Sequence, residues 1–292
     1  MVVLVTGANG QLGQAIQSIA GKYPSIDFVF CSSSELNITD KKNCETVFEK
    51  HKPQFCINAA AYTAVDKAES EPEKAYSINC IGAKNIAETC KEFNTKLIHI
   101  STDFVFDGSK KTPYNETDSP NPKGVYGQTK LQGEKAIQET LEAFYIIRTS
   151  WVYSQFGNNF MKTMLRLASE RDSISVVNDQ IGTPTNAIDL AHSIIKIIES
   201  KLVEKHYGIY NFSNEGQCSW FDFAKKIFEI NQVNIRLLPI PTTQFPTPAE
   251  RPKYSVLDKT KIKNCFGILI ENWETALAYH SKNNNNLNSY KG

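Results

Sequence analysis

The chain lacks both a long apolar segment and an excess of charge. Its 32 lysines and arginines balance 31 aspartates and glutamates over 292 residues, which leaves a net charge of +1. This balance gives no electrostatic reason to bind nucleic acid or an anionic membrane. No apolar run approaches the roughly 20 residues that span a bilayer, and the first one, residues 2–5, is too short for a signal peptide. We therefore expect a cytoplasmic protein that binds neither nucleic acid nor membrane.

Paired cysteines are also missing. The seven cysteines, at positions 31, 44, 56, 80, 90, 218 and 265, are odd in number and scattered. Neither Cys-x-x-Cys nor His-x-His occurs, so the common zinc motifs and a disulfide framework are both excluded. We expect reduced, mostly buried thiols and no bound metal.

Apolar strands and amphipathic helices alternate through the first half of the chain. The predicted strands are residues 2–5, 27–31, 55–58, 96–100 and 144–147, and the intervening helices include residues 14–20, 42–50 and 72–93. Repeated βα units favour an α/β fold with a Rossmann-type doubly wound parallel sheet. In such folds, ligands bind beyond the carboxyl ends of the strands.

The pattern becomes less regular after Trp151. Helices are predicted at residues 159–170, 188–199 and 220–230, short strands at 174–177 and 209–212, and an extended loop at 239–252. We expect a dinucleotide-binding domain over residues 1–150. A smaller, mixed α/β, mainly substrate-binding part follows over residues 151–282, with an approximate boundary that the chain can cross back over. Residues 283–292 are polar and are expected to form a frayed tail.

A glycine-rich turn joins the first strand to the first helix, with the pattern Thr6-Gly-x-x-Gly-x-x-Gly13. Gly7 allows a tight turn, Gly10 lets the backbone approach a pyrophosphate, and Gly13 lets the helix pack closely on the strand. The free N–H groups at the helix start would then face the phosphates. The alternative is a glycine-rich turn without a ligand. The predicted cofactor contacts in this turn are Gly7, Asn9, Gly10, Gln11, Leu12 and Gly13.

Tyr126 and Lys130 stand four residues apart, which places them on one face of a helix. An isolated tyrosine has a pKa of about 10. A nearby ammonium lowers that pKa toward the range in which general acid–base catalysis is efficient. The alternative is an ordinary surface pair, because this short spacing is frequent on helices.

These residues together resemble the extended short-chain dehydrogenase/reductases that modify nucleotide sugars, and within them the dTDP-4-dehydrorhamnose reductases. The resemblance is carried by the glycine turn, by Tyr126-x-x-x-Lys130, and by residues 58–72, 101–106, 126–134, 148–153, 178–184 and 248–252. It covers most of the chain and is far more specific than the glycine turn alone.

The resemblance implies that reduced nicotinamide delivers a hydride to C4 of dTDP-4-dehydro-L-rhamnose. The product would be dTDP-L-rhamnose, a precursor of cell-surface polysaccharide. The implied catalytic residues are Thr102, a hydrogen-bond donor to the keto oxygen, Tyr126, the proton donor, and Lys130, which holds the nicotinamide ribose. Further implied cofactor contacts are Ser32, Ala59, Ala60 and Ala61. The implied substrate contacts are Thr63, Val65, Thr102, Asp103, Phe104, Trp151 and Arg251.

The chain departs from the family pattern at two places. The end of the second strand, residues 31–34, lacks the acid that binds an NAD ribose and the arginine typical of NADP sites. Serine hydroxyls there favour NADPH modestly, and NADH is the alternative. The first helix, residues 11–20, has no acid, which weakens the case for the magnesium-bridged dimer of some relatives. A homodimer is left open.

Other functions compete with this interpretation. A sugar-nucleotide dehydratase on the same fold would usually have Asp-Glu after the threonine, whereas this chain has Thr102-Asp103-Phe104. A sugar-nucleotide epimerase and a non-catalytic NADP-binding regulatory subunit are further alternatives. The intact Thr102, Tyr126 and Lys130 argue against a non-catalytic subunit. Trp151 could equally be a core indole, and Arg251 a solvated loop arginine. The sugar itself, rhamnose or a related 6-deoxyhexose, is not determined.

Overall fold

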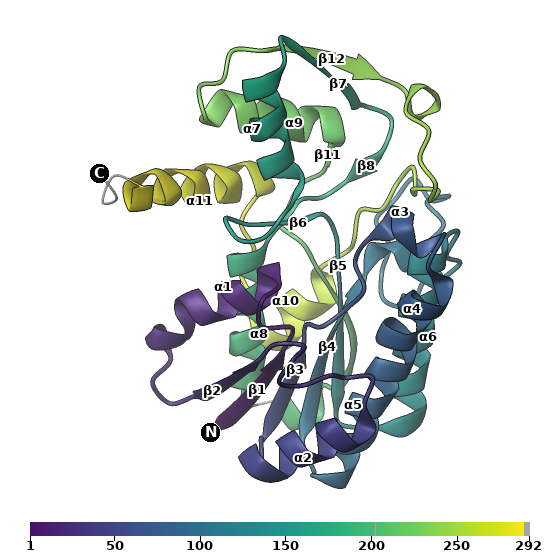
Figure 1. Cartoon of the computed structure of the whole chain (residues 1–292). Helices are drawn as coiled ribbons and strands as arrows, with labels where there is room; N and C mark the ends of the chain where they lie inside the picture. The colour runs from purple at the N-terminus through teal and green to yellow at the C-terminus, as the bar shows by residue number, and fades with distance from the viewer. Residues whose placement is uncertain (202, 289–292) are drawn as a thin grey trace.

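A computed structural model describes residues 1–201 and 203–288. Its main body is a six-stranded sheet flanked by helices, and a smaller part lies above it (Figure 1). The sheet strands are β1 (Val2–Thr6), β2 (Asp27–Cys31), β3 (Phe55–Asn58), β4 (Lys96–Thr102), β5 (Phe144–Thr149) and β10 (Gly208–Phe212). The helices beside them are α1 (Gln11–Ile19), α2 (Lys41–His51), α3 (Val65–Ala68), α4 (Pro72–Tyr76), α5 (Ala83–Glu92), α6 (Val125–Thr140), α8 (Ala187–Ile198) and α10 (Thr260–Phe266).

The sheet is parallel throughout and is covered on both faces. Its strand order is β10-β5-β4-β3-β1-β2, so the chain reverses direction across the sheet between β1 and β3. Helices α1 and α8 bury one apolar cluster, which includes Ile16 and Ile194. Helices α2, α5 and α6 bury the other, which includes Phe48, Ile86 and Ile137. The predicted doubly wound sheet is therefore confirmed, and its reversal point marks where a ligand is expected.

The smaller part is built from α7 (Phe160–Glu170), α9 (Trp220–Ile230), α11 (Trp273–Asn288) and short strands. These strands are β6 (Val152–Tyr153), β7 (Ser173–Val177), β8 (Ile181–Gly182), β9 (Thr185–Asn186), β11 (Cys218–Ser219) and β12 (Arg236–Ile240). Strands β7 and β12 pair in parallel over a third apolar cluster. Strand β10 returns to the main sheet beside β5, and α8 covers one of its faces, so the chain crosses between the two parts more than once.

Three predicted elements differ in detail. The predicted helix over residues 72–93 is interrupted by a π-helical stretch, Ser77–Gly82, between α4 and α5. The predicted loop over residues 239–252 begins inside β12. The predicted frayed tail starts too early, because α11 continues to Asn288, and residues 289–292 lie outside the described residues. Buried Trp273 and Leu277 anchor the start of α11, and a helix once begun propagates through less favourable residues such as asparagine.

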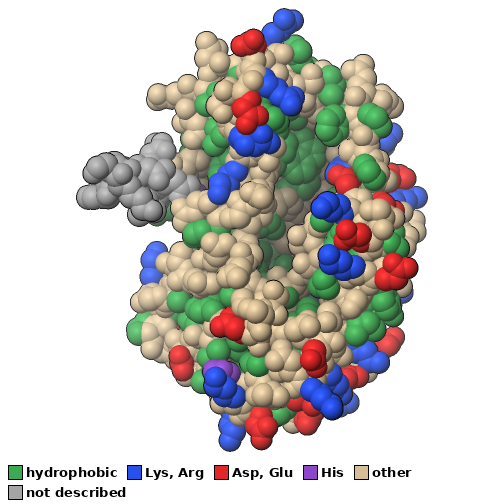
Figure 2. Space-filling view, in the orientation of Figure 1, with side chains coloured by type: hydrophobic (Ala, Val, Ile, Leu, Met, Phe, Trp, Pro, Cys, Tyr) green, Lys and Arg blue, Asp and Glu red, His purple; other side chains and the backbone are tan. Residues whose placement is uncertain are grey.

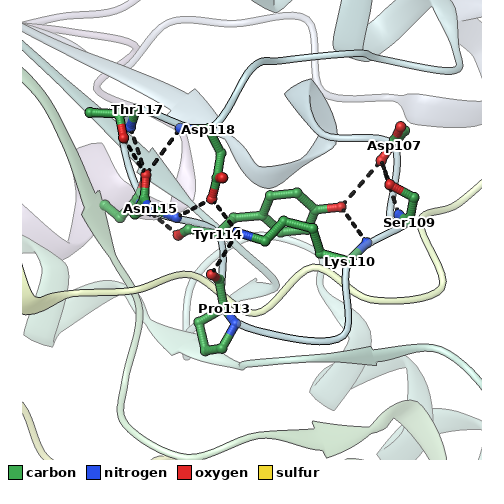
Figure 3. Close-up of polar contacts among 9 residues, drawn as sticks. Asp107, Ser109, Lys110, Pro113, Tyr114, Asn115, Thr117 and Asp118 are labelled. Atoms are coloured by element: carbon green, nitrogen blue, oxygen red, sulfur yellow. Dashed lines mark hydrogen bonds and ion pairs between the residues drawn. The ribbon is translucent and has the colours of Figure 1, made fainter.

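The loop between β4 and α6 fixes the C-terminal segment to the main sheet. Tyr114 accepts a backbone hydrogen bond from Asp258 (2.8 Å) and donates its hydroxyl to Asp107 (3.2 Å). Lys110 pairs with Asp118 across the same loop at 2.5 Å (Figure 3). These hydrogen bonds hold the loop that follows β4 against the C-terminal segment.

No described helix is both long enough and apolar enough to cross a membrane.

Candidate active site

A cleft of about 810 Å³ lies at the carboxyl ends of β1, β3 and β4, between the main sheet and the smaller part. Figure 2 shows the hollow, with hydrophobic side chains on its wall. Most residues predicted from the sequence line it, namely Gly7, Asn9, Gly10, Gln11, Leu12, Ala59, Ala60, Ala61, Thr63, Val65, Thr102, Asp103, Phe104, Tyr126, Lys130, Trp151 and Arg251. Gly13 and Ser32, which were also predicted as cofactor contacts, do not line it.

The glycine turn requires glycine at two of its positions. Gly7 has a φ of 64°, and a Cβ there would lie 2.7 Å from the backbone nitrogen of Ala60. A Cβ on Gly13 would lie 2.5 Å from the carbonyl oxygen of Gly7. Gly13 therefore serves the close packing of α1 on the turn, which explains why it lies behind the cleft wall.

The N-terminus of α1 is open toward the cleft. Gly10 is the N-cap residue, and among the described residues no side chain caps this end. The side chain of Gln11 turns away, because it donates to the carbonyl of Val152 (3.2 Å) and accepts from Ser154 (3.0 Å). The first-turn N–H groups and the positive end of the helix dipole are therefore available to an anion. This cradle fits the pyrophosphate of a dinucleotide.

The end of β2 carries a carboxylate that the sequence analysis missed. Glu35 accepts hydrogen bonds from the backbone nitrogen of Ser32 (2.8 Å) and from its hydroxyl (2.7 Å). The turn that brings Glu35 back is closed by a hydrogen bond from its own N–H to the carbonyl of Ser32. Residues 31–34 themselves carry no acid, but Glu35, the next residue, brings a carboxylate against this strand end. The polar donors of Ser32 already serve an anion supplied by the protein.

Thr102 and Tyr126 meet at the end of β4. The Thr102 hydroxyl accepts from the backbone nitrogen of Phe104 (3.2 Å) and donates to Asp103 (3.1 Å). The Tyr126 ring packs edge-on against Phe104. Burial raises the pKa of Tyr126 to about 12, and a hydrogen bond with Thr102 opposes the rise. Tyr126 is thus a neutral phenol at neutral pH, as a proton donor must be.

Lys130 lies one helical turn after Tyr126 but is held elsewhere. Its Nζ donates to the carbonyl of Ile100 (2.6 Å) and lies 3.2 Å from Nε2 of His99. Burial lowers the pKa of Lys130 to about 8. The expected lowering of the tyrosine's pKa by this lysine is not found in the protein alone. Desolvation of the phenol is the stronger effect.

Asp103 is a buried carboxyl beside both residues. It is 2% exposed, and burial raises its pKa to about 6, although hydrogen bonds from Ser255 and Thr102 oppose the rise. Its negative charge in turn disfavours ionisation of Tyr126. The centre therefore resists extra negative charge and keeps Tyr126 protonated.

Trp151 and Arg251 stand on the side of the smaller part. Trp151 adopts a φ of 47° and stacks on Trp220 with ring centroids 3.6 Å apart. Arg251 binds Asp66 through both carboxylate oxygens, at 2.9 and 2.7 Å. Arg251 therefore has a fixed partner and lines the cleft, while 24% of its side chain is exposed.

Several lining residues were not predicted from the sequence. They are Ser33, Leu36, Asn37, Ile38, Thr39, Ile78, Ile100, Ser101, Thr149, Val152, Gly157, Asn158, Asn159 and Trp220. Residues 36–39 follow β2 directly, so their place beyond a strand end was a usable signal. Trp220 carries no such signal, because its approach to Trp151 depends on how α9 packs within the smaller part.

Comparison with known proteins agrees with this geometry. Residues 1–285 match the family model described as the RmlD substrate binding domain. A dTDP-4-dehydrorhamnose reductase from Aggregatibacter actinomycetemcomitans is 44% identical over 286 residues, which cover 94% of this chain and 96% of that protein. The Escherichia coli K12 enzyme of the same name is 40% identical, with 95% and 96% covered.

Solved structures show the same likeness. A dTDP-4-dehydrorhamnose reductase from Clostridium acetobutylicum superposes with a TM-score of 0.92 at 41% identity, over 97% of this chain and 99% of that one. The enzyme from Bacillus anthracis, solved in complex with NADP, also gives 0.92, at 42% identity and the same coverage. A UDP-glucose 4-epimerase from Thermus thermophilus, at 19% identity and a TM-score of 0.80, shares the fold alone.

Proposed function

The chain belongs to the dTDP-4-dehydrorhamnose reductase family, and from this premise we propose that Thr102, Tyr126 and Lys130 carry out its reaction. The enzyme is an NAD(P)H-dependent oxidoreductase that reduces the C4 keto group of dTDP-4-dehydro-L-rhamnose to give dTDP-L-rhamnose. The observation that carries the proposed roles is the convergence of the glycine turn, the end of β4 and the start of α6 on one cleft.

Tyr126 is the proton donor in this proposal. Reduction turns the C4 carbonyl oxygen into an alkoxide, which must take up a proton. A buried phenol whose pKa is raised to about 12 is fully protonated at neutral pH and gives up its proton only as that alkoxide forms. When bound, the reduced nicotinamide supplies the hydride.

Thr102 binds the substrate's keto oxygen in this proposal, and Lys130 binds the cofactor. The Thr102 hydroxyl exchanges its bond to Asp103 for one to the keto oxygen, where negative charge develops. Lys130 has two of its three N–H donors directed at His99 and Ile100, and it offers the third to the nicotinamide ribose.

The cofactor and the sugar nucleotide occupy opposite ends of the cleft in this proposal. The NADP complex of a relative supports NADPH as the cofactor. In this proposal its pyrophosphate lies at the start of α1 and its adenosine ribose, which carries the 2′-phosphate, lies near Ser33. Glu35 keeps the preference over NADH small, because it competes with a 2′-phosphate for the donors of Ser32. Trp151 and Arg251 would contact the sugar and the diphosphate, and Thr63, Val65 and Phe104 would line the sugar-nucleotide side.

We also assign the enzyme to the cytoplasm. All seven cysteines are free thiols and six of them are buried, which is usual in a reducing compartment. A homodimer stays a prediction.

The experiment that tests the proposal uses purified enzyme, NADPH and the 4-keto sugar nucleotide, followed at 340 nm. We expect oxidation of one NADPH per sugar, and NMR of the product should show the rhamnose configuration at C4. The C4 epimer would mean that the sugar is held by its other face. Binding of NADPH without oxidation would contradict the catalytic assignment.

A further inference from the structure

A row of buried polar side chains crosses the sheet beneath α6. The strand register places Thr6 of β1 beside Asn58 of β3, and Asn58 beside His99 of β4. Cross-strand neighbours project from the same face, here the face otherwise filled by the apolar cluster under α2, α5 and α6. Each of the three is at most 1% exposed. Polar groups in such a place are costly unless they are hydrogen-bonded, so their partners indicate what the row does.

The partners connect the two halves of the cleft. The backbone nitrogen of Ala60 donates to the Thr6 hydroxyl (3.2 Å), which lies 2.7 Å from the side-chain amide of Asn58. The Asn58 amide lies 3.1 Å from Nδ1 of His99, and Nε2 of His99 lies 3.2 Å from Nζ of Lys130. One end of the row is therefore the turn over Ala59, Ala60 and Ala61, on the cofactor side of the cleft, and the other end is Lys130.

The imidazole of His99 is suited to hold a cation. Burial and the charge of Lys130 keep the pKa of His99 well below its ordinary value, so the ring is neutral at neutral pH. A neutral imidazole has one N–H and one accepting nitrogen, and it does not repel the ammonium. With Nε2 accepting from Lys130, Nδ1 carries the proton and donates to the Asn58 side-chain amide, whose oxygen then faces His99 and whose NH2 faces Thr6. The carbonyl of Ile100, at 2.6 Å, is the second fixed acceptor.

We propose that His99 is a positioning residue for Lys130, and that Asn58 and Thr6 couple this position to the Ala60 turn. The proposal rests on the role assigned above to Lys130. Two fixed acceptors on one side of the ammonium aim its remaining N–H in a single direction, toward the cofactor side of the cleft. The same row fixes the position of the Ala60 turn relative to Lys130. The turn and the lysine are therefore held at a constant spacing for their two contacts with the cofactor.

The remaining ionisable groups around Lys130 define what a pH measurement will report. Glu134, one turn further along α6, is bound by Arg148 (2.7 Å) and Ser101 (2.5 Å), and it raises the pKa of Lys130 slightly against the lowering by burial. Tyr126, one turn before, stays protonated. Removing the acceptor at His99 disfavours the charged amine, so the pKa of Lys130 should fall.

The test uses two variants whose side-chain amide replaces one ring nitrogen of His99 but not the other. The amide of His99→Gln reaches the place of Nε2 and preserves a partner for Lys130, whereas the amide of His99→Asn reaches only the place of Nδ1. In His99→Asn we expect the alkaline limb of kcat/KM for NADPH to move down by about one pH unit and the KM to rise about tenfold, since a hydrogen bond to a charged group is lost. His99→Gln should stay within about twofold of the parent.

The proposal is overturned if His99→Asn leaves the alkaline limb in place, or if His99→Gln moves it as far. Ile146→Val, at the other cross-strand neighbour of His99, controls for simple loss of packing and should move neither quantity. Lys130→Ala distinguishes a failure of the role of His99 from a failure of the role of Lys130. If it is impaired while His99→Asn is normal, only the role of His99 fails, and if it is normal, the proposed role of Lys130 fails first.

Thr6→Val provides an independent arm should the His99 variants not fold. It removes one hydroxyl at constant shape and breaks the link to Ala60. We expect NADPH to bind about threefold to tenfold more weakly, by quenching of tryptophan fluorescence, with the alkaline limb unmoved. Unchanged NADPH affinity would show that the row does not hold the turn.

Discussion

Tyr126 differs from phenylalanine by one oxygen, and in the proposed mechanism that oxygen carries the proton that the reaction consumes. Tyr126→Phe should leave NADPH binding intact and lower kcat by about 10²- to 10⁴-fold, the usual loss when a general acid is removed. Lys130→Ala should impair both steps. Because both residues act on one transition state, the double variant should be far less impaired than the product of the single effects. Steady-state kinetics of the four proteins measures this, and strictly multiplicative effects would mean that the residues act independently.

Asp103 makes stability depend on pH in a defined direction. Its pKa is about 6 in the folded protein against 3.8 when unperturbed, so the native state binds more protons between these values. The free energy of unfolding should therefore fall as pH rises from about 4 to about 6. Asp103→Asn cannot ionise and should gain about 2–3 kcal/mol relative to the parent between pH 4 and pH 7. Urea unfolding at both pH values measures this, and an equal difference at the two would contradict a raised pKa.

Glu35 is the residue that sequence analysis missed at the end of β2. Only a turn places it against Ser32, and a side chain's reach across a turn is not visible in a strand pattern. Glu35→Gln removes its charge, so kcat/KM for NADPH relative to NADH should rise about threefold to tenfold, as expected for removal of one nearby like charge. Glu49→Gln, at an exposed position of α2, is the control and should leave the ratio unchanged.

At the scale of elements, the junction of β1 and α1 tolerates no side chain at its closest approach. In Gly13→Ala the new Cβ would lie 2.5 Å from the backbone oxygen of Gly7. Because the clashing atom belongs to the backbone, no side-chain rotation can relieve the clash. We expect a loss of about 1–3 kcal/mol in stability, a lower Tm, and at least a tenfold weaker affinity for NADPH. Gly21→Ala is the matched control, because no described atom lies within 4 Å of its Cβ. A stability of Gly13→Ala equal to that of Gly21→Ala would show that a small backbone shift relieves the close approach at no cost.

The elements that the sequence predicted well are those whose pattern is local. Strands β1, β3 and β4 were placed correctly. Both of their faces are buried, so each appears in the sequence as a short continuous apolar run. The π-helical stretch Ser77–Gly82 contains no proline and follows α4 without a turn signal, so the sequence did not mark it as a separate element. The end of α11 was missed for the opposite reason, since its asparagines suggest a loop while its anchor lies earlier, at Trp273.

At the scale of the whole molecule, what the sequence could not supply was the arrangement between distant segments. Strand β10 was predicted as a strand, but its place beside β5 depends on the return of the chain across the body (Figure 1). The residues proposed as catalytic, which line the cleft, could be named because motifs in the first 130 residues carry them. The opposite wall, with Trp220 stacked on Trp151, depends on packing between residues some 70 positions apart within the smaller part, which no local pattern reveals.

The ion pair of Arg251 with Asp66 connects these two walls and gives a prediction for the cleft as a unit. Asp66 lies in α3 of the main body, whereas Arg251 belongs to the C-terminal segment. The guanidinium uses only its two terminal nitrogens to bind the Asp66 carboxylate and the Ala249 carbonyl. Its remaining N–H groups can face a diphosphate while Asp66 keeps the planar group in place. The carboxylate therefore orients the arginine.

Asp66→Asn should accordingly raise KM for the dTDP-sugar about threefold to tenfold, as expected for loss of a partly exposed pair worth about 1 kcal/mol. kcat should change less, because the reacting carbon is held by the other wall. Glu170→Gln, which breaks the exposed pair with Arg166 on α7, is the control and should change neither constant. A lower KM in Asp66→Asn would show the reverse relation, in which the carboxylate competes with the substrate's phosphates for the arginine and must be displaced before the sugar nucleotide binds.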